Sequence, residues 1–438
     1  METGRGTVHS YTVRPRGHPF DRHVALAPSL AEVLRAHADA LFVVADEGPG
    51  LSGSSFASVS RALASFGIPD DRIVLLPSWI PSGAGFVSPG ARERWQRHRK
   101  LAVSFEALWV HSGRLARALG TPGADFVDVG AGRWRPLWFD APRRYPPVHP
   151  QHERRKYLWV TRAWGARLRA APSPATREAA RRAGAQLLKF VGFGPRGRLA
   201  RERGMRLAAA GFAPRAVGAM HGFLIIELAP GAPLTAGGAD AALVERLAQY
   251  LAFVAREFRT DDPPRMGELL HLVATNAAHA LGPRRAPTPD ALAALAAPSA
   301  DVSAVALDGR MLPYEWLRDG PGPHATLLKS DGTDHHDDHF YPGPQDMAWD
   351  VAATCVEHEL PLDAQRLLVR RYRDLSDDHG IVARLPFYRI AYLAYRYGYA
   401  TLAADTLVGT EEAPRWRAAA QRYAVALERA VARGSDAA

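Results

Sequence analysis

The chain is poor in several features, and each shortage excludes a class of protein. Its only cysteine is Cys355, which rules out an internal disulfide and a zinc site built from thiolates. No run of about eighteen apolar residues occurs, so the sequence predicts no membrane-spanning helix. The first residues, METGRGTVHS, carry no apolar signal core. We therefore expect a cytoplasmic protein without a membrane partner.

Lysine is also scarce. Of the 55 basic residues only four are lysines, at positions 100, 156, 189 and 329. The arginines are spread along the whole chain without a stripe of basic and aromatic residues, so the net charge of +10 does not predict nucleic-acid binding. An anionic small molecule, above all a nucleotide, fits this charge. Because a lysine offers a compact point charge, the few lysines are candidate phosphate contacts.

Length and composition indicate an ordinary globular protein with more than one domain. Apolar residues make up 47% of the sequence and charged residues 23%, which is typical of a folded chain. With 438 residues the chain can form two or three domains. The turn Thr121-Pro-Gly123 predicts a boundary, which gives the segments 1–120, 121–232 and 233–438.

The first segment contains a predicted βαβ unit. Residues 41–45 form a buried strand, residues 56–66 an amphipathic helix and residues 72–76 a second, parallel strand. The loop before the helix, residues 46–55, reads Asp-Glu-Gly-Pro-Gly-Leu-Ser-Gly-Ser-Ser. Backbone N–H groups and the helix dipole make the start of such a helix a favourable place for an anion.

This loop resembles the phosphoribosyl pyrophosphate motif of the type I phosphoribosyltransferases. In that motif an acidic pair holds the ribose hydroxyls and a turn of small residues holds the phosphate. The resemblance implies that Asp46 and Glu47 are the acidic pair and that the phosphate cradle consists of Ser52, Gly53, Ser54 and Ser55. A plain strand-to-helix turn, phosphate or ribose binding, and full phosphoribosyl transfer are all compatible with the sequence.

The strongest functional signal is an acidic stretch from residue 307 to residue 352. So many acidic groups repel one another unless a cation or hydrogen-bond donors neutralise them. A predicted hairpin over residues 316–329 brings Asp331 back beside Asp308 and Glu315. Three carboxylates from two loops suit a magnesium–nucleotide site, because magnesium takes few carboxylates and leaves its other positions to water and phosphate.

Histidines accompany the carboxylates between residues 334 and 339, in the order Asp-His-His-Asp-Asp-His. This composition suits zinc or iron, but neighbouring side chains on a strand point to opposite faces, so at most two or three of them could share an ion. A magnesium site with satisfied or substrate-facing histidines is one alternative, and a solvated loop is another.

A second set of signals precedes the acidic stretch. Gly130 and Gly132 lie in a predicted hairpin turn, which either covers a phosphate or is a plain turn. Further on come a strand that carries Lys189, an amphipathic helix that carries Glu202, and two more strands that end in a Pro-Gly hinge. Lys156 is a rival to Lys189 because it lies closer to the glycine turn. A surface lysine and a surface glutamate are the plain alternatives.

Taken together, these features resemble the aminoglycoside phosphotransferase and protein-kinase-like superfamily. The resemblance covers the C-terminal two thirds of the chain and includes the helix start Gly343-Pro-Gln-Asp-Met-Ala-Trp-Asp-Val-Ala. The family's His-x-Asp triplet and metal-binding Asn are absent, and Glu315 stands seven residues after Asp308. The implied fold is an α/β N-terminal segment followed by an α+β bilobal kinase-like fold, with an antiparallel-sheet N-lobe and a mostly helical C-lobe.

The resemblance also assigns roles. It implies that Asp308 accepts the proton of the acceptor hydroxyl and that Glu315 and Asp331 hold Mg²⁺, with Asp338 as a second candidate for the later metal ligand. The nucleotide contacts that it implies are Lys189 held by Glu202, or Lys156 in place of Lys189, the turn at Gly130 and Gly132 over the phosphates, and the hinge at Glu227 and Leu228 against adenine.

The sequence therefore predicts an ATP- and Mg²⁺-dependent phosphotransferase acting on a hydroxyl of a small molecule. Two alternatives stay open: a non-catalytic, pseudokinase-like nucleotide-binding module with a regulatory role, and phosphoribosyl transfer by the N-terminal segment. In the last segment we expect helices over residues 243–258, 266–281, 351–360, 362–375, 384–399 and 413–433. We expect Cys355 and a stripe of tyrosines at positions 388, 392, 395 and 399 to pack inside this segment.

Overall fold

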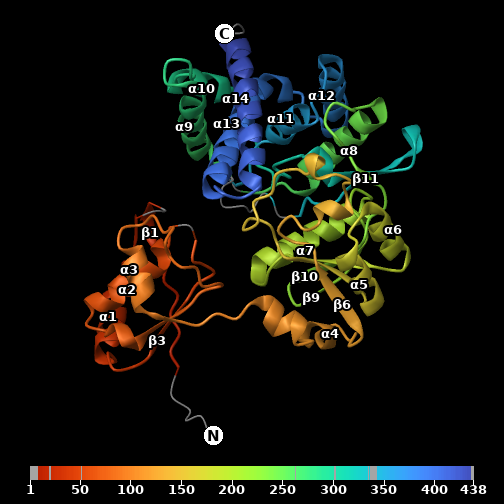
Figure 1. Cartoon of the computed structure of the whole chain (residues 1–438). Coiled ribbons are helices and arrows are strands. Elements are labelled where there is room, and N and C mark those ends of the chain that lie inside the picture. The colour runs from red at the N-terminus through yellow and green to blue at the C-terminus, as the bar shows by residue number, and fades with distance from the viewer. Residues whose placement is uncertain are drawn as a thin grey trace. The chain divides into compact units, whose positions relative to one another are not determined.

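The computed structural model forms two compact units, Met1–Pro122 and Gly123–Ala438, and the division falls within the Thr121-Pro-Gly123 segment of the sequence. Figure 1 colours the chain from red at its first residues to blue at its last. None of the described helices has the length and apolar character that crossing a membrane requires. The residues that the structure describes are 8–18, 21–50, 52–261, 263–299, 302–333, 335 and 343–435.

The N-terminal unit is built on a small parallel sheet. Strands β3 (Phe42–Ala45), β4 (Ile73–Leu76) and β5 (Arg99–Lys100) lie side by side in that order and run parallel. Helix α2 (Ser54–Ser65) connects β3 to β4, so the predicted βαβ unit is confirmed, but β3 alternates between half-buried and exposed residues and is not the buried strand expected. The remaining elements are β1 (Arg16–His18), β2 (Asp21–His23), α1 (Pro28–Ala36), a 3-10 turn (Asp70–Arg72), α3 (Ala91–Arg97), a π-helical turn (Glu106–His111) and α4 (Arg114–Ala118).

The second unit begins with a five-stranded antiparallel sheet. Its order in space is β6 (Ala124–Asp128), β7 (Lys156–Thr161), β8 (Gln186–Phe190), β10 (Phe223–Glu227) and β9 (Ala216–Met220). Neighbouring strands pair antiparallel throughout the sheet. This is the antiparallel-sheet lobe that the sequence predicts.

Three helices cover the same face of this sheet. Helices α5 (Arg162–Ala170) and α6 (Pro174–Arg182) come between β7 and β8, and α7 (Gly194–Ala209) comes between β8 and β9. Leu158 of β7 packs with α5 and α6, while Leu224 of β10 packs with α7. The strand registers place both leucines on one face, because side chains alternate along each strand. The sequence analysis did not assign α5 and α6.

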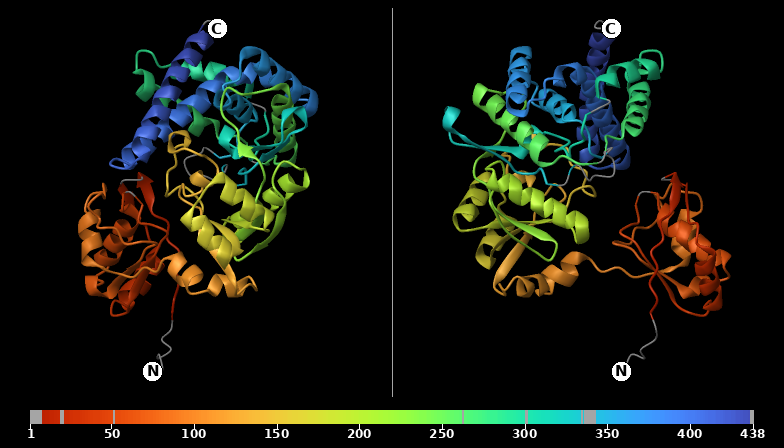
Figure 2. Two further views of the ribbon diagram at one scale, coloured as in Figure 1. Left: turned by 45° about the vertical axis from the view of Figure 1, so that its right-hand side comes forward. Right: turned by 180° about the vertical axis from the view of Figure 1, so that it is seen from behind.

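The second lobe is mostly helical, with the predicted hairpin packed into it. Strands β12 (Trp316–Asp319) and β13 (Thr326–Lys329) form that hairpin, and β11 (Ala232–Pro233) pairs with β12. Both views in Figure 2 show the helices of this lobe above the sheet. The predicted bilobal architecture is confirmed. The helices are α8 (Ala241–Glu257), α9 (Met266–Leu281), α10 (Pro289–Ala296), α11 (Ala348–Glu357), α12 (Leu362–Ser376), α13 (Ile381–Thr406) and α14 (Glu412–Ser435).

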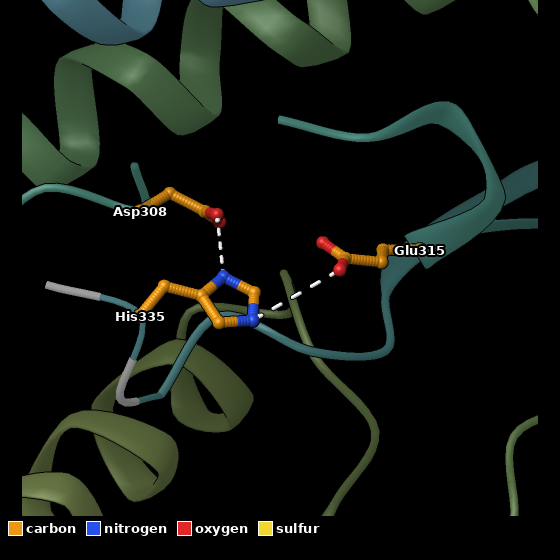
Figure 3. Close-up of side chains that lie close together, drawn as sticks. All are labelled: Asp308, Glu315 and His335. Atoms are coloured by element: carbon orange, nitrogen blue, oxygen red, sulfur yellow. Dashed lines mark hydrogen bonds and ion pairs between the residues drawn. The ribbon is translucent and has the colours of Figure 1, made fainter. Parts of the chain in front are cut away.

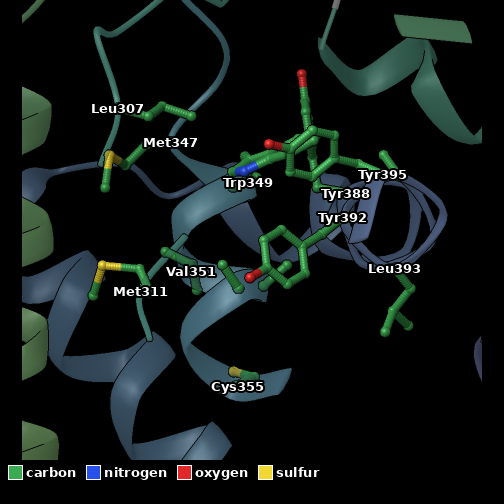
Figure 4. Close-up of a cluster of buried hydrophobic side chains, with 14 of the residues drawn as sticks. Leu307, Met311, Met347, Trp349, Val351, Cys355, Tyr388, Tyr392, Leu393 and Tyr395 are labelled. Carbon is green, nitrogen blue, oxygen red and sulfur yellow. The ribbon is translucent and has the colours of Figure 1, made fainter. Parts of the chain in front are cut away.

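The core of the helical lobe contains the predicted tyrosine stripe. Tyr388, Tyr392 and Tyr395 of α13 are buried, and Trp349 of α11 packs against the last two with ring centroids 5.6 and 5.4 Å apart. Figure 4 shows these rings together with Cys355, which is also buried. The tyrosines therefore serve packing, as the three- to four-residue spacing indicates.

Candidate functional site

The hairpin β12–β13 folds the acidic stretch back on itself. The backbone N and the Oγ of Ser330 donate to the carbonyl oxygen of Glu315 at 2.7 and 3.0 Å, which brings Asp331 beside Glu315. The chain then passes close to Asp308. A Cβ atom added to Gly332 would lie 3.1 Å from Asp308 Oδ2, so a glycine suits this close approach. The predicted meeting of the three carboxylates thus has a simple backbone cause.

Asp308 is completely buried and held from several sides. The hydroxyl of Tyr250 on α8 donates to Asp308 Oδ2 at 2.6 Å. Asp350 on α11 accepts from the backbone N of Asp308 at 2.8 Å and from the next backbone N at 2.9 Å. Burial alone would raise the pKa of Asp308, but the charges of Lys329 and His335 outweigh it and hold the pKa below its usual range.

Asp331 forms ion pairs with both lysines that are candidates for the phosphate contact. Lys189 Nζ lies 2.5 Å from Asp331 Oδ1, and Lys156 Nζ lies 3.2 Å from Asp331 Oδ2. The two lysines stand opposite each other on β8 and β7, so their side chains share a face. Burial would raise the pKa of Asp331, but these two ammonium groups lower it well below the ordinary value. Both lysines, not one of them, converge on the acidic hairpin.

A third lysine lies between the other two carboxylates. Lys329 Nζ is 2.5 Å from Glu315 Oε2, 3.2 Å from Asp308 Oδ2 and 2.5 Å from the backbone oxygen of Asp331. Its side chain is fully buried. Burial would lower its pKa, but the neighbouring carboxylates raise it to about 12. Three of the four lysines in the chain therefore belong to one cluster, and only Lys100 lies in the other unit.

One described histidine completes the cluster. Figure 3 shows the ring of His335 between the carboxylates of Asp308 and Glu315. Its Nδ1 lies 3.2 Å from Asp308 Oδ1, and its Nε2 lies 3.9 Å from Glu315 Oε1 and 3.7 Å from Asp331 Oδ1. Burial would lower the pKa of His335, but the three carboxylates raise it. Ligand atoms of Asp308, Glu315 and His335 lie within 4.8 Å of one another, a spacing that suits a metal ion.

The predicted pair of Lys189 and Glu202 is wrong. Glu202 is exposed on α7, and among the described residues Lys189 pairs with Asp331 and donates to Thr333 Oγ1 at 2.8 Å. The next residue of the helix, Arg203, points inward instead and is buried. Its guanidinium donates to the backbone oxygens of Gly332 at 2.7 Å and Ala306 at 2.5 Å. Helix α7 therefore contacts both acidic loops through an arginine.

The glycine turn is part of a longer connection than the predicted hairpin turn. Strands β6 and β7 do pair, but residues 129–155 form a long connection between them. The backbone N of Gly130 donates to Asp128 Oδ1 and that of Gly132 to Glu153 Oε2, both at 2.9 Å. Both amides are thus directed to carboxylates of the chain itself. The connection also reaches the helical lobe, where Glu412 accepts from the backbone N of Val148 at 2.9 Å.

The hinge residues border a cavity of about 360 Å³. Residues 227–230 are among its lining residues, as are Arg181 and Arg215. Glu227 is exposed and pairs with Arg215, whereas the side chain of Leu228 is buried in the cluster beneath β6 and β7. Just beyond the hinge, Arg177 of α6 donates to the backbone oxygen of Gly231 at 2.8 Å. An adenine contact at this hinge stays a prediction.

The Gly/Ser loop of the N-terminal unit combines exposed carboxylates with a turn of small residues in which Gly53 and Ser54 are buried. Asp46 and Glu47 are exposed at the end of β3, and Asp46 accepts from the backbone N of Glu47 at 3.0 Å. The hydroxyls of Ser52 and Ser54 lie 2.8 Å apart, and Arg22 donates to Ser55 Oγ at 3.0 Å. Gly53, with φ at 66°, precedes α2, and a Cβ there would lie 2.6 Å from the ring of Phe86. The remaining predicted site residue, Asp338, lies outside the described residues.

Sequence reasoning missed two side chains that hold the acidic cluster, Tyr250 and Arg203, and did not assign the roles of Asp350 and Lys329. Lys329 gave a signal as one of four lysines, two residues before Asp331, but was expected only as a candidate phosphate contact. Asp350 is part of the helix start that the sequence analysis identifies, but no role was predicted for it. Its pKa is raised to about 7 because it is buried beside Asp308, although it accepts two backbone hydrogen bonds.

No family model and no curated protein matches the chain. Solved structures with a similar fold include a choline kinase, LicA, from Streptococcus pneumoniae, with 15% identity over 62% of this chain and 89% of that one, at a TM-score of 0.39. An ethanolamine kinase from Plasmodium vivax has 9% identity over 74% and 89%, at 0.42. The macrolide 2′-phosphotransferase MphH from Brachybacterium faecium has 16% identity over 72% and 97%, at 0.38. Likeness at these values does not assign a function to this chain.

Proposed function

We propose that the second unit is an ATP- and Mg²⁺-dependent phosphotransferase that phosphorylates a hydroxyl of a small molecule. One observation carries the proposal: the ammonium groups of Lys156 and Lys189 converge on Asp331, next to the buried Asp308 and Glu315. Buried charges are rare unless they are paired or used. Without a nucleotide, Asp331 supplies the negative charge that pairs with the two lysines. A bound triphosphate would supply that charge in its place.

Magnesium fits this donor set. Asp331 and Glu315 supply carboxylate oxygens, which are the ligands that Mg²⁺ prefers, and these two residues would hold it. Glu315 has one oxygen bound to Lys329, while its other oxygen, Oε1, faces His335 at 3.9 Å. When bound, the ion would neutralise charge on the β and γ phosphates. Lys156 and Lys189 would neutralise the remaining phosphate charge.

Asp308 is the proton acceptor in this proposal. The acceptor's hydroxyl oxygen forms a bond to the γ phosphorus while the bond from that phosphorus to the β–γ bridging oxygen breaks. The hydroxyl proton passes to an oxygen of Asp308. In the structure Oδ2 faces Tyr250 and Lys329, and Oδ1 faces His335. The acceptor can therefore reach Asp308 only after the His335 ring has moved from Oδ1.

The cover that His335 forms over Asp308 also favours a second candidate. If the ring stays in place, the unit is a non-catalytic nucleotide-binding module with a regulatory role. The two candidates share the lysines and Asp331 and differ only in the use of Asp308. Binding and turnover therefore have to be measured separately.

The test is a thermal shift with MgATP, followed by a screen of small alcohols for phosphate transfer. We expect MgATP to raise the melting temperature and Asp331→Asn to remove the rise, because the variant loses the charge that holds the ion. Asp374→Asn is the matched control, since this surface carboxylate of α12 lies outside the acidic site. No shift in the unmodified protein would refute both candidates, and a shift without turnover for any acceptor would favour the regulatory module.

The Gly/Ser loop supports a separate proposal for the first unit, namely binding of a phosphoribosyl group. The exposed acidic pair Asp46 and Glu47 ends a parallel strand, and three serines and Arg22 gather at the start of α2. Phosphoribosyl pyrophosphate should raise the melting temperature, and Asp46→Ala should reduce that rise. An equal rise in the unmodified protein and in the variant would mean that Asp46 takes no part in binding. The loop would then be a plain strand-to-helix turn.

A further inference from the structure

Lys329 differs from the other two lysines of the acidic site in what surrounds it. Three oxygens lie within 3.2 Å of its ammonium: Asp308 Oδ2, Glu315 Oε2 and the backbone oxygen of Asp331. An ammonium has three N–H donors, so this group is fully occupied. Its side chain has no exposed surface, whereas those of Lys189 and Lys156 are 3% and 17% exposed. Lys329 is built into the site and does not face an incoming ligand.

The ammonium occupies the position in which two carboxylates would otherwise share a metal ion. Asp308 and Glu315 come from different loops, and both face Lys329. Without a cation between them these buried carboxylates would repel each other. A divalent ion placed there would need the same Asp308 Oδ2 and Glu315 Oε2 oxygens that Lys329 now binds. The two cations exclude each other at this position.

The charges of the cluster point the same way. Among the described residues, the carboxylates of Asp308, Glu315 and Asp331 face the ammonium groups of lysines 156, 189 and 329. When a triphosphate draws Lys156 and Lys189 away from Asp331, the charge of Asp331 is left open for one ion. The three carboxylates then face only the ammonium of Lys329, so a single divalent ion balances the two negative charges that remain.

We propose that Lys329 replaces one divalent cation, so that the site takes a single metal ion per bound nucleotide. The inference rests on the proposed nucleotide site and adds its metal count and the reason for it. Lys329 is a positioning residue here: it fixes Asp308 and Glu315 relative to each other and does not touch the substrate. A glutamate seven residues after Asp308 suits this arrangement, because its longer side chain reaches Lys329 with one oxygen and keeps the other for an ion.

Binding of Mn²⁺ in the presence of a non-hydrolysable ATP analogue, counted by electron paramagnetic resonance, tests the proposal without any turnover. We expect one ion per chain in the unmodified protein and two in Lys329→Met, because the variant frees Asp308 and Glu315 for a second ion. Lys100→Met is the matched control and should bind one, since Lys100 lies in the other unit and donates to the backbone oxygens of Trp95 and His98.

The outcomes separate this inference from the proposed function. Two ions in the unmodified protein, or one in a folded Lys329→Met, would overturn the role of Lys329 and leave the phosphotransferase proposal intact. No nucleotide-dependent ion in the unmodified protein would overturn both. Each count is taken on protein that melts cooperatively.

A second measurement needs no variant, which matters if Lys329→Met does not fold. With only four lysines, a protein labelled with ¹⁵N at the lysine side chains gives four ammonium positions to follow. We expect the Lys329 signal to persist when Mg²⁺ and the analogue are added, while the Lys156 and Lys189 signals shift. A Lys329 signal that shifts as much as these two would show that an ion displaces it, and would overturn the proposal.

Discussion

The acidic site of the second unit and the Gly/Ser loop of the first both combine carboxylates with candidate phosphate contacts, yet they are built differently. Asp308 is fully buried, and Asp331 is bound by two lysines from neighbouring strands. Asp46 is exposed and accepts from the adjacent backbone N. Gathering buried charges is unfavourable for folding unless they are paired or used, whereas exposed acidic residues in a turn need no such explanation. Because of this difference, the acidic site is the stronger candidate for a functional site.

The largest expected effect separates catalysis from binding at the acidic site. Asp308→Asn removes the proposed proton acceptor but keeps a side chain of nearly the same shape, which still accepts from Tyr250. We expect phosphate transfer to fall by about 10²–10⁴-fold, while the melting shift with MgATP stays. Turnover near that of the unmodified protein would show that Asp308 is not the acceptor. The role of Asp308 would then be refuted, while the phosphotransferase proposal would stand.

The next effect compares the two lysines that meet at Asp331. Lys189 is 3% exposed and lies 2.5 Å from the carboxylate, whereas Lys156 is 17% exposed and lies 3.2 Å away. Solvent screens the attraction between an ammonium and a phosphate less when the ammonium is more buried. Lys189→Met should therefore weaken nucleotide binding more than Lys156→Met does. We expect a loss on the order of 10–10²-fold for Lys189→Met. Titration with the ATP analogue measures both, and the reverse order would make Lys156 the main phosphate contact.

A smaller effect, on stability, tests the corrected role of helix α7. Arg203→Ala leaves the carbonyl oxygens of Gly332 and Ala306 without their donor and should lower the free energy of unfolding by about 2–3 kcal/mol. Glu202→Ala, one residue earlier and exposed, is the matched control and should change it by less than about 0.5 kcal/mol. Urea unfolding measures both. Equal losses would mean that Glu202 also contributes to the lobe contact.

These residues also show what could be predicted from the sequence. Asp308 and Asp331 follow from a hairpin whose ends must meet, and Lys156 and Lys189 stand out because lysine is scarce in this chain. Arg203 does not stand out, because arginines lie all along α7 and its hydrophobic face is weakly marked. Adjacent helix residues point about 100° apart. An error of one residue in the expected inward position therefore replaces a predicted glutamate with an arginine.

Helix α6 and the long connection between β6 and β7 were not predicted, for a different reason. Helix α6 reads PATREAARR, so its apolar residues are only alanines and one proline; Ala180 packs in the cluster that contains Leu158, and Arg177 is buried. The connection from residue 129 to residue 155 is fixed by Glu412, more than two hundred residues further along the chain. Contacts of this range leave no local pattern. The sequence therefore predicts a hairpin turn at Gly130 and Gly132, whereas their amides bind carboxylates within a long loop.

The last prediction is that a variant has no effect. It tests directly whether the nucleotide binds at the acidic site or at the Gly/Ser loop. Asp46→Ala changes only the Gly/Ser loop, where the carboxylate is exposed and accepts from the backbone N of Glu47. If the nucleotide binds at the acidic site, the melting shift with MgATP should equal that of the unmodified protein, because Lys156, Lys189 and Asp331 are untouched. If the shift disappears while Asp331→Asn keeps it, the triphosphate binds in the first unit. The buried lysine–carboxylate cluster would then be a structural element that holds the two lobes of the second unit together.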